Sequence, residues 1–407
     1  VVKEVSRLLV DNYIFPETAK KMEQHLLAQL DAGKYDKIEN VNAFAQALTG
    51  DLRSISHDKH IRVTYSPETV KMIRAGSSRS AEDREKARKA NIERQRQGNF
   101  GFRKLEIMEG NIGYLDLTGF TGLDEAAETI IAAMNFLANS DAVIIDLRNN
   151  GGGDPYTIQI ISSYFLDETT HLNSFEWRGE DTIRQFWTLP YVPGKKMYDI
   201  DLFILTSSRT FSAAEEFTYN LKNLDRAIIV GETTGGGAHP GGNRIVDDYF
   251  LVWVPGGRAI NPVTKSNWEG TGIEPHIKVG QAQALEKAHY EALDRLAERE
   301  EDETRKQRFE WAMDGLRAKM EPAEVDEATL QKYVGKYTRG EVKLEKGELF
   351  LKTQQQVYKM IPRTQSYFIL EDWPQVRIEF VLDDSGKDYV IKAHIEDGST
   401  EMVPRIK

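Results

Sequence analysis

The strongest constraint on the fold is a nearly unbroken apolar run at residues 142–147 (AVIIDL), followed at once by a glycine-containing loop. A run without polar alternation is typical of a strand buried on both faces of a sheet. Residues 202–205 and 227–230 repeat this pattern, and apolar helical segments are expected between the strands at 156–165 and 212–224. Strand–loop–helix units in series predict an α/β core.

The pattern of apolar and polar residues changes on either side of this core. Apolar residues at helical spacing predict three helices before residue 56, whereas short alternating strands after Pro322 predict a small β-barrel or sandwich. The segment between the N-terminal helices and the core is charged. The predicted organisation is an N-terminal helical domain (1–60), a strand and charged helical linker (61–100), the core (101–280), a helical connector (281–322) and the C-terminal β domain (323–407).

Charge and composition exclude several classes of protein. The 407 residues carry a net charge of −11 with no basic patch, which argues against a nucleic-acid partner. The absence of cysteine excludes disulfides, thiol chemistry and cysteine-ligated metals. No run of about 18 apolar residues is present, so no transmembrane segment is expected. The chain begins at Val1, which fits either a mature form or a trimmed chain; we expect an exported protein of a bacterial periplasm or cell envelope, with the cytoplasm as the alternative.

Ser212 lies where a buried strand gives way to a helix. A hydroxyl at this junction is next to the free N–H groups and the positive dipole end of the helix, which are able to stabilise an oxyanion. The same serine forms an S-x-x-E pattern with Glu215, the spacing of a helix-capping box. Both a nucleophile and a cap fit this position.

A glycine loop follows the first buried strand, in the sequence DLRNNGGGD. Its glycines permit positive φ angles and expose backbone N–H groups. The loop matches neither common nucleotide-binding motif. An oxyanion-binding loop and a tight strand-to-helix turn both remain open. A second glycine-rich segment at 231–242 contains His239 and suits a peptide-binding loop or an irregular connection.

Five segments, in order, resemble the C-terminal-processing (tail-specific) protease family. They are GYLDL at 113–117, AVIIDLRNNGGG at 142–153, TSSRTFSAAEEF at 206–217, RAIIVGETTGGG at 226–237 and WEGTGIEPH at 268–276. The resemblance implies a crotonase-like α/β spiral core and a serine peptidase with Ser212 as nucleophile. It also implies an oxyanion hole built from the backbone N–H groups of Gly151 or Gly152 and of Ala213.

The chain departs from the family pattern at the position of the catalytic base. Most members use a lysine at the position of Gly237, and residues 231–242 contain no lysine. The family's usual PDZ domain is also missing. A subgroup similar to the tricorn protease and to interphotoreceptor retinoid-binding protein departs in the same way. By resemblance to its site, Ser56 and His57 (in LRSISHDKHIRV) and Glu269 complete the catalytic set.

The implied mechanism uses His57 as general base for Ser212, with Ser56 or Glu269 orienting the site. His239 is the rival base, because it lies two residues beyond the family's lysine position. Other interpretations remain: His57 caps a helix or joins Asp58 and His60 at a metal, and Glu269 is a surface turn residue. We expect no metal and no cofactor.

The sequence therefore favours a serine endopeptidase or oligopeptidase acting on peptides or unfolded protein, of unassigned oligomeric state. The alternative is a non-catalytic binding protein for apolar small molecules or peptides, because relatives keep this fold without the chemistry.

Overall fold

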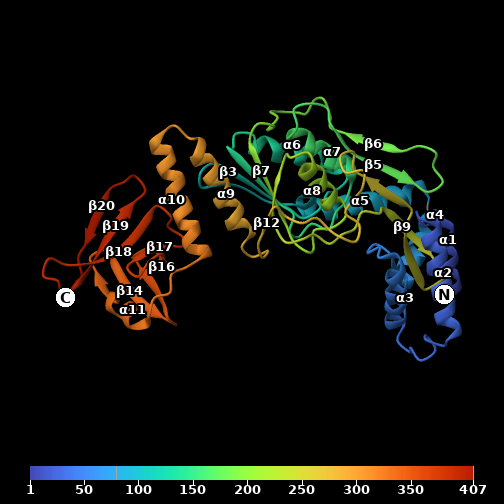
Figure 1. The fold of residues 1–407 in the computed structure, drawn as a ribbon, viewed down its shortest axis with the longest axis horizontal. Helices are drawn as coiled ribbons and strands as arrows, with labels where there is room; N and C mark the ends of the chain where they lie inside the picture. Colours follow the sequence, from blue (N-terminus) through green and yellow to red (C-terminus); the bar gives the residue numbers. More distant parts are fainter. Residues whose placement is uncertain (79, 407) are drawn as a thin grey trace. The chain divides into compact units, whose positions relative to one another are not determined.

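The computed structural model describes residues 1–78 and 80–406, which form two compact units (Figure 1). The first unit comprises Val1–Ile107 and Gly113–Gln281, and the second comprises Met108–Ile112 and Ala282–Lys407. The finer division into five sequence segments stays a prediction.

The first unit begins with three amphipathic helices, α1 (Val2–Asn12), α2 (Pro16–Asp31) and α3 (Val41–Ser56). Pro16 starts α2, and the side chain of Asn40 caps α3 by accepting from Asn42 N and Ala43 N. Their apolar faces do not form a separate core. They pack with residues of a small antiparallel sheet of β1 (Arg62–Tyr65), β10 (Phe250–Pro255) and β9 (Gly241–Ile245). Residues some 200 positions downstream in the chain therefore complete the N-terminal core.

The prediction of an α/β core is confirmed by a six-stranded sheet in the order β12-β8-β7-β4-β3-β2. The pairs β4–β7, β7–β8 and β8–β12 are parallel. All five residues of β4 are buried, as its apolar run predicts. The strands are β2 (Phe102–Met108), β3 (Ile112–Leu117), β4 (Ala142–Asp146), β7 (Asp201–Thr206), β8 (Ile228–Gly231) and β12 (Ile277–Lys278).

Three helices share a hydrophobic core with this sheet: α6 (Leu123–Leu137), α7 (Pro155–Tyr164) and α8 (Ala213–Asn223). A third, antiparallel sheet follows the order β11-β5-β6 and stands beside the site described below. Its strands are β5 (His171–Trp177), β6 (Arg184–Trp187) and β11 (Gly257–Ile260). The crotonase-like course of the chain stays a prediction.

The charged linker is helical. It contains α4 (Pro67–Ser78) and α5 (Ala81–Gln97), followed by the short 3-10 turn η1 (Asn99–Gly101). No residue of α5 is buried, which agrees with its lack of an apolar face. Within the part of the chain that the structure describes, no helix is both long and apolar enough to cross a membrane.

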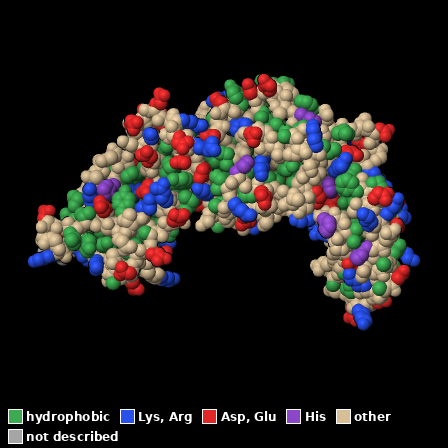
Figure 2. All heavy atoms as spheres, in the orientation of Figure 1, with side chains coloured by type: hydrophobic (Ala, Val, Ile, Leu, Met, Phe, Trp, Pro, Cys, Tyr) green, Lys and Arg blue, Asp and Glu red, His purple; other side chains and the backbone are tan. Residues whose placement is uncertain are grey.

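The second unit contains two charged helices, α9 (Ala284–Arg299) and α10 (Glu303–Met320), a short helix α11 (Glu327–Tyr333) and a β domain. The β domain is a nearly closed eight-stranded antiparallel barrel in chain order, which confirms the predicted C-terminal barrel. On the face seen in Figure 2, acidic and basic side chains are interspersed over this domain. The strands are β13 (Gly335–Tyr337), β14 (Gly340–Glu345), β15 (Glu348–Lys352), β16 (Val357–Pro362), β17 (Tyr367–Leu370), β18 (Val376–Leu382), β19 (Tyr389–Ile395) and β20 (Thr400–Val403).

Candidate active site

Ser212 occupies a strained turn between β7 and α8. Its backbone has φ 54° and ψ −119°, a conformation that costs about 1–3 kcal/mol for a residue with a side chain. The capping box foreseen from the sequence is present, and Ser212 N donates to Glu215 Oε2 at 2.9 Å. Strain of this kind concentrates at functional sites, and the cap holds the serine at the start of α8.

Glu215 ties this turn to the second glycine-rich segment. Its Oε2 also accepts from Gly237 N at 2.8 Å, and its Oε1 accepts from Gly236 N at 2.6 Å and Thr234 Oγ1 at 2.5 Å. Burial raises the pKa of Glu215, although these hydrogen bonds oppose the rise. Because Ser212 N and Gly237 N share one acceptor oxygen, Ser212 and Gly237 are close neighbours.

The first glycine loop also reaches Ser212. A Cβ added to Gly152 would lie 2.9 Å from both Ser212 Cβ and Ala213 N. Gly152 N already donates to Asn150 Oδ1 at 2.9 Å. Within residues 1–78 and 80–406, no hydrogen bond occupies Gly151 N or Ala213 N. Of the expected oxyanion donors, Gly151 and Ala213 therefore have free N–H groups, and Ala213 lines the same cavity as Ser212.

His60 lies beside the residue that precedes the serine. Its ring packs against Phe211 with centroids 4.7 Å apart, and its Cε1 is 2.7 Å from the place of a Cβ on Gly237. Burial lowers the pKa of His60 to about 4, with Asp58 opposing the shift. The imidazole is therefore neutral at pH 7. Its Nδ1 is buried without a hydrogen-bond partner among the described residues, 4.0 Å from Asp58 Oδ1.

Asp58 organises a buried polar cluster next to His60. Its Oδ1 accepts from His60 N at 3.0 Å, and its Oδ2 accepts from Tyr13 Oη at 3.1 Å and pairs with His239 Nδ1 at 2.8 Å. His239 Nδ1 is also 3.5 Å from Glu269 Oε2. The N-terminal helices thus supply Tyr13 to a cluster whose other members come from distant loops.

Glu269 is held by two backbone N–H groups. Its Oε1 accepts from Lys59 N at 3.3 Å and its Oε2 from Ala238 N at 2.5 Å. Burial, and then the charge of Asp58, raise the pKa of Glu269 to about 7, while His239 opposes the rise. Glu269 thus lies in the buried cluster.

Of the predicted residues Ser56 and His57, the structure turns the His57 side chain away from this cluster and uses Ser56 at the helix end. His57 ends α3 in the left-handed conformation (φ 57°) with an exposed side chain. Ser56 Oγ donates to Leu52 O at 3.0 Å and accepts from Asp58 N at 3.2 Å, so it caps the helix end. Reasoning from the sequence did not assign His60, Asp58 or Tyr13 to the candidate site, which the structure places next to Phe211 or in the cluster around Asp58; the histidine spacing in SHDKH was the available signal.

A metal site at His57, Asp58 and His60 was an open interpretation. Within the described residues, a different set, Asp58, His239 and Glu269, places its donor atoms within 4.8 Å of one another. Each of its carboxylate oxygens already takes part in at least one hydrogen bond. The cluster is therefore satisfied by the protein's own polar groups.

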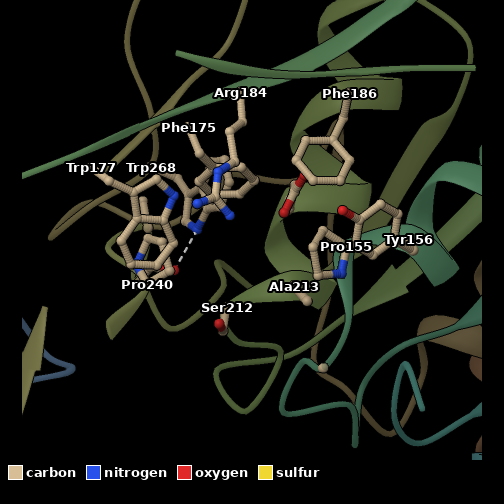
Figure 3. Close-up of a pocket in the computed structure, with 14 residues that line it drawn as sticks. Pro155, Tyr156, Phe175, Trp177, Arg184, Phe186, Ser212, Ala213, Pro240 and Trp268 are labelled. Atoms are coloured by element: carbon tan, nitrogen blue, oxygen red, sulfur yellow. Dashed lines mark hydrogen bonds between the residues drawn. The ribbon is translucent and has the colours of Figure 1, made fainter. Parts of the chain in front are cut away.

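A cavity of about 210 Å³ opens beside Ser212 (Figure 3). Trp177, Trp268 and Pro240 stand on one side of it in this view, and Phe186, Tyr156 and Pro155 stand on the other, with Ser212 and Ala213 below. Glu216, Gly237 and Ala238 complete the wall near the serine. An apolar cavity with a few polar groups next to a strained serine is typical of a substrate site.

Two protein-family models match segments of this chain. Residues 111–279 match the model of peptidase family S41, and residues 1–96 match the model described as the N-terminal domain of peptidase S41 in eukaryotic IRBP. A carboxyl-terminal-processing protease from Picosynechococcus sp. is 31% identical over 136 residues, which cover 33% of this chain and 31% of the relative. The chain thus matches about a third of that relative's length.

Solved structures are similar at lower identity. A photosystem II D1 C-terminal processing protease is 22% identical with a TM-score of 0.35, covering 42% of each chain. A lipoprotein from Streptococcus agalactiae is 15% identical with a TM-score of 0.46, covering 72% of this chain and 95% of the lipoprotein.

Proposed function

Because this chain belongs to the peptidase S41 family, we propose that it is a serine-type peptidase in which Ser212 is the nucleophile. One observation carries the proposal: Ser212 is held in a strained turn at a helix start, beside free backbone N–H groups and an apolar cavity. Peptides or unfolded protein are the proposed substrates, and the bacterial periplasm or cell envelope is the proposed compartment.

We further propose His60 as the general base in place of the exposed His57. Two contacts support this: the packing of His60 on Phe211, and the closeness of His60 Cε1 to Gly237, which shares an acceptor oxygen with Ser212 N. The low pKa of His60 keeps it neutral, as a base must be. The nearby Asp58 carboxylate would stabilise the imidazolium that forms.

In this mechanism Ser212 Oγ attacks the scissile carbonyl carbon while its proton passes to His60. The N–H groups of Ala213 and Gly151 are the proposed oxyanion donors. As the C–N bond breaks, the proton moves from His60 to the leaving amine, and an acyl-enzyme forms. Water, deprotonated by His60, then hydrolyses the ester. Glu269 and His239 hold Asp58 and the loop of Ala238 in place through the contacts already described.

A fluorophosphonate probe tests the proposal directly. We expect wild-type protein to be labelled at Ser212 and the Ser212→Ala variant to remain unlabelled. Labelling would be followed by a peptide-library search for substrates. Absence of labelling in wild-type protein would contradict the proposal.

The aromatic walls of the cavity favour a second candidate, a binding protein for apolar small molecules or peptides. Under that alternative, an apolar ligand binds with equal affinity to wild-type protein and to Ser212→Ala, and neither protein reacts with the probe.

A further inference from the structure

The cavity beside Ser212 contains a buried carboxyl group that the proposed chemistry does not use. Glu216 lies one helical turn after Ser212, and Glu216 N donates to Ser212 O at 2.9 Å. Residues four apart lie on the same face of a helix, so both side chains belong to one surface of α8. Glu216 is 5% exposed and lines the cavity.

Glu216 has no cationic partner in the resting protein. No ion pair involves it within residues 1–78 and 80–406, and the groups that act on it are the amide of Asn173 and the carboxylate of Asp154. Burial raises the pKa of Glu216 to about 8, and Asp154 adds to the rise. At pH 7 the group is therefore mostly a neutral acid, and because buried charges in proteins are normally paired, an incoming cation would favour its ionisation.

The cavity walls suit a side chain that carries its charge at the end of an apolar stem. Phe175, Trp177, Phe186 and Trp268 line the same cavity as Glu216. Aromatic faces pack against methylene groups and also attract cations. The volume of about 210 Å³ admits one long amino-acid side chain.

Arg184 stands on the rim of the same cavity (Figure 3). Its Nη2 donates to Glu180 Oε1 at 2.9 Å, and its side chain is 60% exposed. Arg184 is therefore engaged at the surface, and it is not among the groups that act on Glu216. It would weakly repel a cation that enters, but it does not pair with Glu216.

We propose that this cavity binds the substrate side chain on the acyl side of the scissile bond, and that it selects lysine or arginine by pairing the cationic head with Glu216. The inference rests on the proposed function, since it assigns the specificity of that same site. On binding, Glu216 releases its proton to solvent, and the resulting carboxylate pairs with the substrate cation between the aromatic walls.

Binding to the Ser212→Ala protein tests this inference without requiring catalysis. Two acetylated tetrapeptides would be compared, identical except for a C-terminal lysine or norleucine, which share a stem length and differ in charge. Calorimetry is expected to show the lysine peptide binding about tenfold or more tightly, since a buried hydrogen bond to a charged group is worth at least that factor. In Ser212→Ala/Glu216→Gln the ratio of the two Kd values should fall to about one.

A second variant guards against a folding artefact. Arg184→Gln removes the rim cation, so the preference for the lysine peptide should rise, which a damaged fold would not produce. The inference is overturned if norleucine binds as well as lysine, if neither peptide binds, or if the preference survives Glu216→Gln. The fluorophosphonate experiment on wild-type protein separates the two claims: labelled Ser212 with no lysine preference contradicts only this inference.

Discussion

The imidazole ring of His60 packs against the phenyl ring of Phe211, the residue before Ser212, with ring centroids 4.7 Å apart. His57, only three residues earlier, points into solvent. Replacing His60 and His57 one at a time therefore gives two matched variants. We expect His60→Ala to lower kcat by about 10²–10⁴-fold, the usual contribution of a general base. We expect His57→Ala to lower it less than about twofold.

Peptide hydrolysis, assayed on any substrate found by library screening, measures both variants. A larger loss of kcat in His57→Ala than in His60→Ala would indicate that His57 is the base. A small and equal loss of kcat in both variants would favour His239. Circular dichroism should show both variants folded.

Gly237 offers a steric prediction. A Cβ at this position would come within 2.3 Å of Phe211 Cζ and 2.7 Å of His60 Cε1, so Gly237→Ala must displace one of these rings. We expect at least about a tenfold loss of activity, because small misplacements of catalytic groups are costly. Gly242→Ala is the control from the same segment, since a Cβ there meets nothing within 4 Å. Equal activity of the two variants would contradict the placement of His60.

Tyr13 links the N-terminal helices to the candidate site. Tyr13→Phe removes one buried hydrogen bond to Asp58, and we expect the free energy of unfolding to fall by about 1 kcal/mol in urea denaturation. Tyr35→Phe removes a similar bond to Asp51. Both variants should lose comparable stability, but only Tyr13→Phe should lower kcat, because only Asp58 adjoins His60. A loss of activity in both would indicate a general effect of stability.

The buried carboxyl of Glu216 predicts a dependence of stability on pH. Its pKa is raised from 4.5 to about 8 on folding, so its contribution to stability is fully present below about pH 4.5 and is lost as pH rises through 8. Glu216→Gln cannot ionise. Relative to wild-type protein, the variant should therefore gain stability between pH 5 and pH 8.5, on the order of 3 kcal/mol.

Urea denaturation at several pH values measures this gain directly. A difference between the two proteins that does not change with pH would show that Glu216 keeps an ordinary pKa.

The sequence was informative where one local rule decided the structure. The unbroken apolar run at 142–147 predicted a buried strand, and the S-x-x-E pattern predicted the cap at Ser212; both are present. The sequence was uninformative where a single turn decided which side chain faces inward. The left-handed backbone at His57 sends that side chain outward and His60 inward, and residue types do not reveal this reversal.

Contacts between distant segments were also beyond local reasoning. Residues of β10 complete the N-terminal core, and Asp58 and Lys59 meet His239 and Glu269, which lie 181 and 210 positions away. Nothing in the helical period of α1 or in the strand pattern of β10 signals this pairing, because an amphipathic helix and an apolar strand each accept many partners.

Gly237 also limits how this chain can have diverged from its relatives. The space in front of its Cα is filled by the rings of Phe211 and His60, so the lysine that the family resemblance leads one to expect here would not fit unless a ring moved. A larger side chain at Gly237 therefore requires a change at Phe211 or His60 as well. Under the proposed mechanism, an exchange of histidine for lysine as the base would need at least two coupled substitutions, so a chain with a histidine base is expected to keep it.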